Sequence, residues 1–182
     1  MRETTYSFAR NLLNSEKIKE LNSEIKKYSI KKGEDSPATE AKKTSKITMV
    51  PLGPIHRFLV PFLEFCITAN NNNFGFDLFQ LTSQKIINYN FYESGSEYSW
   101  HVDAESRSPI RDIKLTALLN ISEEQCQGGD LLLFKGKEVV CKEFNTPGSA
   151  VVFPSFTNHK VTKLESGTRA TLAIWMWGPK FR

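Results

Sequence analysis

The sequence has little of what marks secreted, membrane or nucleic-acid-binding proteins. Its three cysteines, at positions 66, 126 and 141, form no C-x-x-C pair, so we expect reduced thiols in a cytoplasmic protein. No run of about 18 apolar residues is present, and the first residues are polar, so neither a membrane span nor a secretory signal is expected. The net charge of +4 is too small to indicate a nucleic-acid partner.

Histidine is also scarce, with only His56, His101 and His159. The remaining composition, 40% hydrophobic and 24% charged over 182 residues, is that of an ordinary globular protein. This length fits one domain over 1–182, with helical support and a leading strand in 1–80 and a catalytic core in 85–182.

Two helices are predicted in the first part of the chain. The first has Asn14 or Ser15 at its start, and its apolar stripe is Ile18, Leu21, Ile25 and Tyr28. A polar, lysine-rich loop is expected over 31–47. The second helix is expected to start at Pro54 and to end at 70–73, with a buried face of Ile55, Phe58, Leu59, Phe62, Leu63 and Cys66.

From Phe74 onward the apolar pattern changes to period two, which favours strands. The expected strands are 85–92, 97–102, 113–120, 129–134, 137–143, 149–153, 158–164 and 168–177. The connections are too short for crossover helices, so a closed sandwich or barrel is indicated rather than βαβ units.

A candidate metal site lies on these strands. His101 and Asp103 are two residues apart, so on a strand both side chains point the same way. His159 can supply a third ligand from another strand. Two histidines and one carboxylate leave part of an ion open, which suits non-heme Fe(II). An H-x-D motif alone often arises by chance, and a lone strand histidine is more often structural.

Arg169, ten residues after His159, gives further support to the iron-site interpretation. Period two places it on one face of the last strand together with Thr171, Ala173 and Trp175. An arginine pointing into a barrel would be a costly unpaired charge, and a bound dicarboxylate would remove that cost through a bidentate contact. The alternative is a pair between Arg169 and a protein carboxylate such as Glu93 or Glu143.

The combination of H-x-D, a distal histidine and a basic residue ten positions later resembles the 2-oxoglutarate/Fe(II) oxygenases. Within that superfamily, residues 88–103 resemble the prolyl 4-hydroxylase-like branch, and 128–131 look like its turn into the fourth barrel strand. The resemblance covers 85–182 well and 1–84 loosely, and extends to compact bacterial and phage members. It implies a mainly β fold, a double-stranded β-helix (jelly-roll) barrel with supporting N-terminal helices.

The resemblance also implies a cofactor set and its ligands. His101, Asp103 and His159 match the iron ligands, and Arg169 matches the residue that binds the distal carboxylate of 2-oxoglutarate. Tyr92 matches a catalytic tyrosine beside that cosubstrate, although it could equally be a barrel-wall residue. The implied cofactors are Fe(II), 2-oxoglutarate and O₂, with ascorbate as a further candidate.

One part of the expected cosubstrate site departs from the pattern. Some members have a tyrosine on the third strand, but residues 114–120 contain none, so Thr116 or Thr171 is expected to donate instead. On the substrate side, Tyr98 and Trp175 match aromatic residues that flank the target proline in prolyl hydroxylases. The alternative is that both residues only pack the barrel.

The resulting hypothesis is a dioxygenase that hydroxylates a C–H bond, foremost of a prolyl residue in a peptide or protein, and releases succinate and CO₂. Three rivals stay open: a hydroxylase of a free amino acid or small metabolite, a catalytically silent binding barrel, and a repair enzyme for alkylated nucleic acid. The last normally has a second arginine six residues after the first, where this chain has Trp175. The polar loop 104–112 is expected to cover the substrate.

Overall fold

A computed structural model describes residues 5–28, 30–31, 43–82, 85–104 and 108–181. The first part of the chain contains β1 (Ser7–Ala9), α1 (Ser15–Tyr28), β2 (Ile30–Lys31), β3 (Lys46–Pro51), α2 (Leu52–Ala69) and a π-helical turn, η1 (Asn70–Phe74). The second part contains β4 (Ile86–Glu93), β5 (Tyr98–His101), β6 (Arg111–Asn120), β7 (Gln127–Gly128), β8 (Leu131–Phe134), β9 (Glu138–Val140), η2 (Lys142–Asn145), β10 (Ala150–Pro154), β11 (Asn158–Val161), β12 (Leu164–Ser166) and β13 (Thr168–Pro179).

The strands form two principal antiparallel sheets. The larger sheet has seven strands in the order β1-β10-β6-β13-β4-β3-β2, and the smaller has four in the order β5-β11-β8-β9. A two-stranded pair joins β12 to β7. This arrangement confirms the expected mainly β, jelly-roll class, and each strand predicted from the period-two pattern has a counterpart.

Both predicted helices are present, with small differences at their ends. Asn14 caps α1, because the Lys17 backbone N–H donates to its Oδ1 at 2.9 Å. The second helix begins at Leu52 rather than Pro54 and continues through the asparagines as the π-helical turn. It ends at Gly75, which has the left-handed φ of 68° that favours glycine.

The expected loop over 31–47 is only partly correct. Residues 32–42 lie outside the described part of the chain, but Lys46 and Ile47 already belong to β3, where they pair with Phe91 and Asn90 of β4. One leading strand was expected within 1–80, without bounds, whereas the structure has the short strands β1 and β2 as well as β3 there. Segments of two or three residues carry too few alternations to register as strands, and their pairing partners lie elsewhere in the chain.

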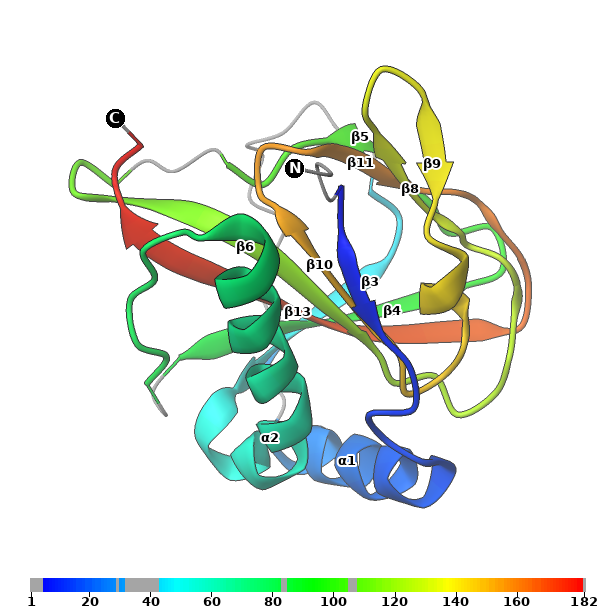
Figure 1. Cartoon of the computed structure of the whole chain (residues 1–182). Coiled ribbons are helices and arrows are strands. Elements are labelled where there is room, and N and C mark those ends of the chain that lie inside the picture. The colour runs from blue at the N-terminus through cyan, green and yellow to red at the C-terminus, as the bar shows by residue number, and fades with distance from the viewer. Residues whose placement is uncertain (1–4, 29, 32–42, 83–84, 105–107, 182) are drawn as a thin grey trace.

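The two faces of the seven-stranded sheet have different surroundings. One face, the helix face, packs against α1 and α2, as Figure 1 shows. Its buried strand residues are Val50, Ile87, Leu115, Ala117, Leu119, Ala150, Val152, Ala170, Leu172, Ile174 and Met176. The opposite face, the inner face, looks toward the four-stranded sheet and shares a second, smaller core of Leu131, Leu133, Cys141, Phe144, Val151 and Phe153. On β6 and β13 the alternate residues Thr116, Asn120, Arg169, Thr171 and Trp175 belong to the inner face.

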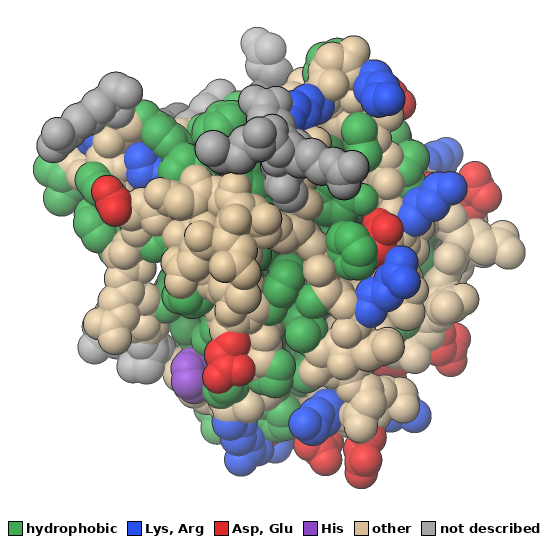
Figure 2. Space-filling model, viewed as in Figure 1, with side chains coloured by type: hydrophobic (Ala, Val, Ile, Leu, Met, Phe, Trp, Pro, Cys, Tyr) green, Lys and Arg blue, Asp and Glu red, His purple; other side chains and the backbone are tan. Residues whose placement is uncertain are grey.

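The helical segment Leu52–Phe74 is long and apolar enough, by length and composition, to cross a membrane. One face of α2, including Ile55, Leu59 and Phe62, is buried against the large sheet. A core helix passes the same compositional test, so this segment does not by itself assign a membrane location. On the surface drawn in Figure 2, basic and acidic side chains are interspersed.

Candidate metal centre

His101 and His159 face each other across two neighbouring strands of the smaller sheet. They are direct partners in the register of β5 and β11, and their ring centroids are 4.0 Å apart. Asp103 follows β5 and is held by its backbone N–H, which donates to the Ser155 carbonyl at 2.9 Å. Its carboxylate lies 3.8 Å from Nε2 of His101 and 3.5 Å from Nε2 of His159. One ligand atom of each of the three side chains lies within 4.8 Å of the other two.

Backbone carbonyls fix the orientation of both imidazoles. Nδ1 of His101 lies 2.8 Å from the Ser99 carbonyl, and Nδ1 of His159 lies 3.0 Å from the Thr157 carbonyl. A carbonyl oxygen can only accept, so each Nδ1 carries the proton and each Nε2 keeps its lone pair for a metal. Burial, reinforced by the neighbouring His159, lowers the pKa of His101 to about 4, so this ring is neutral at pH 7.

Thr116 orients the carboxylate of the group. Its hydroxyl donates to Oδ2 of Asp103 at 2.7 Å. The Thr116 proton is thus directed at Asp103, and whether Thr116 or Thr171 donates to the cosubstrate stays a prediction. Sequence reasoning missed this contact, since it joins β6 to a residue beyond the end of β5.

Arg169 is buried and lacks a carboxylate partner within the described residues. It is only 2% exposed, and its Nε and Nη2 atoms have no hydrogen-bond partner. The two carboxylates considered as alternatives are engaged elsewhere, Glu93 by Lys46 at 2.8 Å and Glu143 by the Tyr6 hydroxyl at 3.0 Å. Burial lowers the pKa of Arg169, and the nearby Tyr92 and Asp130 only partly oppose this effect.

Gly129 makes room for this guanidinium. Its φ is +69°, a conformation that side chains other than glycine rarely adopt. A Cβ at this position would come within 2.9 Å of Leu164 Cδ1 and 3.4 Å of Arg169 Nη1. On the other side, the Arg169 guanidinium lies 4.8 Å from the Phe144 ring centroid. The glycine pair at 128–129 was interpreted from the sequence only as a turn, so its role as clearance for Arg169 was missed.

The other residues expected around the cosubstrate lie beside Arg169. Tyr92 of β4 is its direct partner across the strands and is 4% exposed. Burial raises the pKa of Tyr92, so its hydroxyl keeps its proton and can donate a hydrogen bond. Thr171 lies two residues further along β13 and is 5% exposed.

The two aromatic residues expected at the substrate side each lie near a residue of the metal group or its support. The Tyr98 ring stacks on the His101 ring, with centroids 3.6 Å apart and an interplanar angle of 19°. Trp175 lies directly opposite Thr116 in the pairing of β13 with β6. Its indole Nε1 is buried and has no acceptor within the described residues.

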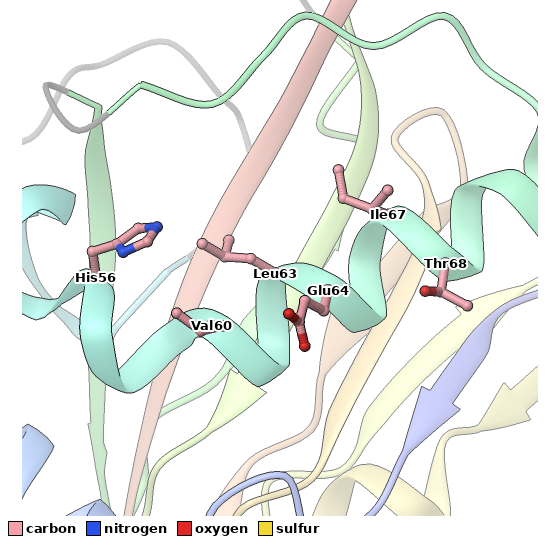
Figure 3. A pocket seen from close by; sticks show the side chains of 6 residues that line it. All are labelled: His56, Val60, Leu63, Glu64, Ile67 and Thr68. Atoms are coloured by element: carbon pink, nitrogen blue, oxygen red, sulfur yellow. The ribbon is translucent and has the colours of Figure 1, made fainter.

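His56, the third histidine, lies apart from this group. It lines a pocket of about 350 Å³ on the outer side of α2, together with Val60, Leu63, Glu64, Ile67 and Thr68. Figure 3 shows that these side chains all come from successive turns of one helix. The pocket brings together no metal-ligating set.

The residues present fit an iron ion and a dicarboxylate. Two neutral imidazoles and one carboxylate converge, which is the donor set that suits Fe(II). On the inner face of the large sheet, Arg169 has orphaned donors, and Gly129 leaves space beside them. A planar guanidinium with free N–H groups matches a carboxylate of 2-oxoglutarate.

Comparison with known proteins gives one family for this chain. The family model described as 2OG-Fe(II) oxygenase superfamily matches residues 87–177, half of the chain. A PKHD-type hydroxylase of Synechococcus sp. (strain CC9605) is 40% identical over 85 residues, which are 46% of this chain and 37% of that relative. The chain thus matches well under half the length of this curated relative.

Solved structures share the fold at lower identity. A Pseudomonas putida prolyl-4-hydroxylase superposes with a TM-score of 0.68 at 20% identity, covering 96% of this chain and 92% of that one. A Trichoplax adhaerens prolyl hydroxylase, solved with a hypoxia inducible factor peptide fragment, gives 0.67 at 15% identity, covering 94% and 83%. At these identities the likeness shows the fold alone.

Proposed function

The chain belongs to the 2OG-Fe(II) oxygenase superfamily, and on this premise we propose that it is an Fe(II)- and 2-oxoglutarate-dependent dioxygenase that hydroxylates a prolyl residue in a peptide or protein. The observation that carries the proposal is the joint presence of a complete ligand set and an orphaned buried arginine. A catalytically silent barrel has no need for either feature, because each costs folding stability when left empty.

The protein's own groups have distinct roles in this proposal. His101, Asp103 and His159 hold the metal, and the carbonyls behind both Nδ1 atoms keep the rings in ligating orientation. Arg169 binds the distal carboxylate of 2-oxoglutarate, with Tyr92 beside it as a neutral donor. When bound, Fe(II) with 2-oxoglutarate and O₂ supplies the oxidising power that converts a C–H bond to an alcohol, with release of succinate and CO₂.

The prolyl substrate rests on the two aromatic side chains. Tyr98 stacks on His101, and Trp175 lies opposite Thr116, the residue that binds Asp103. Such walls suit a flat, rigid pyrrolidine ring, whose target carbon must be held close to the metal. The fold relatives named above are prolyl hydroxylases, which supports this choice. A free amino acid or small metabolite is the alternative substrate class.

The proposal also includes a second contact to the cosubstrate, a reductant, a cellular location and a substrate cover. Thr171 is proposed as the second contact to the distal carboxylate, since Thr116 is bound to Asp103. Ascorbate is proposed as a reductant, and a cytoplasmic location without a membrane or nucleic-acid partner is retained. The expected substrate cover over 104–112 includes residues 105–107, which lie outside the described part of the chain.

The test is a mass-shift screen with Fe(II) and 2-oxoglutarate over proline-containing peptides, proline-free peptides and free amino acids. We expect succinate release, and a gain of one oxygen that is largest for proline-containing peptides. A proline-free substrate accepted equally well would contradict the prolyl assignment. Absence of succinate under all conditions would contradict the dioxygenase assignment.

Trp175→Ala separates a substrate wall from a packing residue. If Trp175 positions substrate, 2-oxoglutarate is still consumed slowly while product formation falls much further. If Trp175 only packs the barrel, the free energy of unfolding falls by roughly 3–5 kcal/mol and both activities fall together. The ratio of succinate to hydroxylated product distinguishes the two results.

A further inference from the structure

Lys43 lies in the segment that was expected to be a polar loop, but it is half-buried in the structure. Its Nζ donates to Oδ1 of Asn90 at 3.0 Å. Asn90 is 5% exposed and is the direct cross-strand partner of Thr171, so it belongs to the inner face of the large sheet. The ammonium of Lys43 is therefore anchored on the same face that carries Arg169.

The same ammonium contacts Tyr98 of the smaller sheet. Its Nζ lies over the Tyr98 ring, 4.5 Å from the ring centroid, and the backbones of the two residues form an isolated antiparallel bridge. The Tyr98 ring in turn stacks on the imidazole of His101, with centroids 3.6 Å apart. Lys43 thus joins the inner face of the large sheet to a ring that lies directly against a residue of the metal group.

Attachment of the segment to the sheets does not account for these contacts. Thr44 already ties the segment to Glu97: the Thr44 N–H donates to the Glu97 carbonyl at 3.1 Å, and the Glu97 N–H donates to Thr44 Oγ1 at 2.8 Å. From Lys46 onward the segment is paired with β4 as β3. A short polar side chain at position 43 would leave these hydrogen bonds intact, so the length and charge of Lys43 indicate a role at the Tyr98 ring.

The Tyr98 ring helps to fix the orientation of His101. The Ser99 carbonyl holds Nδ1 of His101 at 2.8 Å, which fixes one atom of the imidazole, and the stacked ring limits rotation about that contact. A cation over an aromatic face is attracted to the ring's π-electrons, so Lys43 holds Tyr98 in place. Contacts behind a ligand orient it and tune metal affinity.

We propose that Lys43 is a positioning residue of the metal centre, which fixes the Tyr98 ring and, through that ring, the imidazole of His101. This inference rests on the proposed function and deepens it, because it assigns a role at the oxygenase site to the segment that precedes β3. Tyr98 is also the proposed substrate wall, so its position relative to the metal should depend on Lys43 as well.

The direction of the effect separates positioning from the effect of charge alone. An ammonium near a divalent metal ion repels it, so removal of the Lys43 charge would by itself tighten metal binding. Loss of positioning has the opposite sign, because an imidazole that is free to rotate is a weaker ligand. Co(II) is the probe, since its optical spectrum reports ligand geometry without turnover.

The test is a Co(II) titration of the wild type and of variants at positions 43 and 98. Lys43→Met keeps the stem and removes the charge, and it should bind Co(II) about 2- to 30-fold more weakly, the range that corresponds to one cation–π contact, with a changed spectrum. Lys43→Arg should restore most of the affinity, because a guanidinium also stacks on aromatic rings. In a Tyr98→Leu background, Lys43→Met should have no further effect, since the ring through which it acts is gone.

Lys46→Met is the matched control, because it removes an equal charge from an exposed lysine of the same segment, which pairs with Glu93. It should leave the Co(II) affinity and spectrum unchanged. If Lys43→Met does not fold, Asn90→Ala removes the acceptor that holds the ammonium, and it should weaken Co(II) binding only while Tyr98 is present. A purely structural Lys43 would change the thermal midpoint of the metal-free protein but not the Co(II) spectrum.

The outcomes separate this inference from the proposed function. Unchanged or tighter Co(II) binding by Lys43→Met, or an equal loss of affinity in the Tyr98→Leu background, would overturn the positioning role. A wild type that binds no Co(II) would overturn the metal centre and this inference with it. A wild type that binds Co(II) but releases no succinate with Fe(II) and 2-oxoglutarate would overturn the dioxygenase function alone, and the titrations would still decide the role of Lys43.

Discussion

The two faces of the seven-stranded sheet are built from the same strands but have opposite properties. On β6, Leu115, Ala117 and Leu119 are buried in the apolar core beneath the helices. Thr116 and Asn120, on the inner face of the same strand, are equally buried but polar. Parts of β6 and β13 thus alternate between residues that stabilise the fold and residues available for chemistry.

The two faces contribute with opposite sign to the free energy of folding. Apolar burial on the helix face contributes on the order of 25 cal/mol per Å² removed from water. On the inner face, Arg169 and the Trp175 indole leave donors without acceptors in the described part of the chain. Mutations on the two faces should therefore separate stability from ligand binding.

The largest expected effect is that of removing a metal ligand, which lies on or beside the smaller sheet that the inner face looks toward. His101→Ala, Asp103→Ala or His159→Ala should each weaken Fe(II) binding more than about 100-fold, since even residues behind a ligand contribute 10–100-fold. Turnover should vanish while the thermal midpoint of the metal-free protein stays nearly unchanged. Anaerobic Fe(II) titration and succinate release measure both effects. His56→Ala is the control and should behave as wild type; a His159→Ala variant with wild-type succinate release would contradict the assignment.

The helix face should give the largest change in stability. Phe62→Ala should lower the free energy of unfolding by about 3–5 kcal/mol, because Phe62 is fully buried beneath the sheet. The folded fraction should keep its affinity for 2-oxoglutarate. Urea unfolding gives the first quantity and calorimetry the second. Val60→Ala, on the outer side of the same helix, is the control and should change the free energy of unfolding by less than about 1 kcal/mol. A loss as large as that of Phe62→Ala would contradict the view that the buried face of the helix carries the stability.

Arg169 should show opposite effects on binding and stability. Arg169→Ala should weaken 2-oxoglutarate binding by about 2–5 kcal/mol, and Arg169→Lys should lose less because one ammonium still pairs with the carboxylate. Arg169→Met should raise the melting temperature of ligand-free protein, since it removes a buried charge that has no anion. If Arg169→Met lowers that temperature and leaves 2-oxoglutarate binding intact, the arginine is structural.

The smallest expected effect concerns Thr116. Thr116→Val removes the donor to Oδ2 of Asp103 at nearly constant volume and should reduce Fe(II) affinity by about 10–100-fold. Thr116→Ser keeps the hydroxyl and should restore most of the affinity. Substitution of Co(II) gives an optical spectrum that reports ligand geometry independently of turnover. Identical spectra and metal affinities for valine and wild type would show that the contact is incidental.

Sequence reasoning found the elements whose pattern is local. The stripe from Ile18 to Ile25 identified α1, although Tyr28, its last member, is 42% exposed. Period two identified β13 and, with it, the shared face of Arg169 and Trp175. Spacing also selected His101, Asp103 and His159, which the structure brings together.

What sequence reasoning missed depends on contacts between distant segments. The contact of Thr116 with Asp103 and the clearance that Gly129 leaves for Arg169 are each set by a neighbouring strand. A threonine and a glycine each have common explanations in local sequence. Only the assembled sheets show that these explanations do not apply.

The position of β13 in the large sheet has a consequence for the order of folding. This strand lies between β6 and β4, yet it is made after every other strand named here. Until β13 has been synthesised, β4 and β6 lack the strand that joins them, and Tyr92 lacks its cross-strand neighbour Arg169. Contacts of such long sequence separation form slowly. Closure of the sheet and completion of the cosubstrate site should therefore be one late event, so a nascent chain has no partly active form.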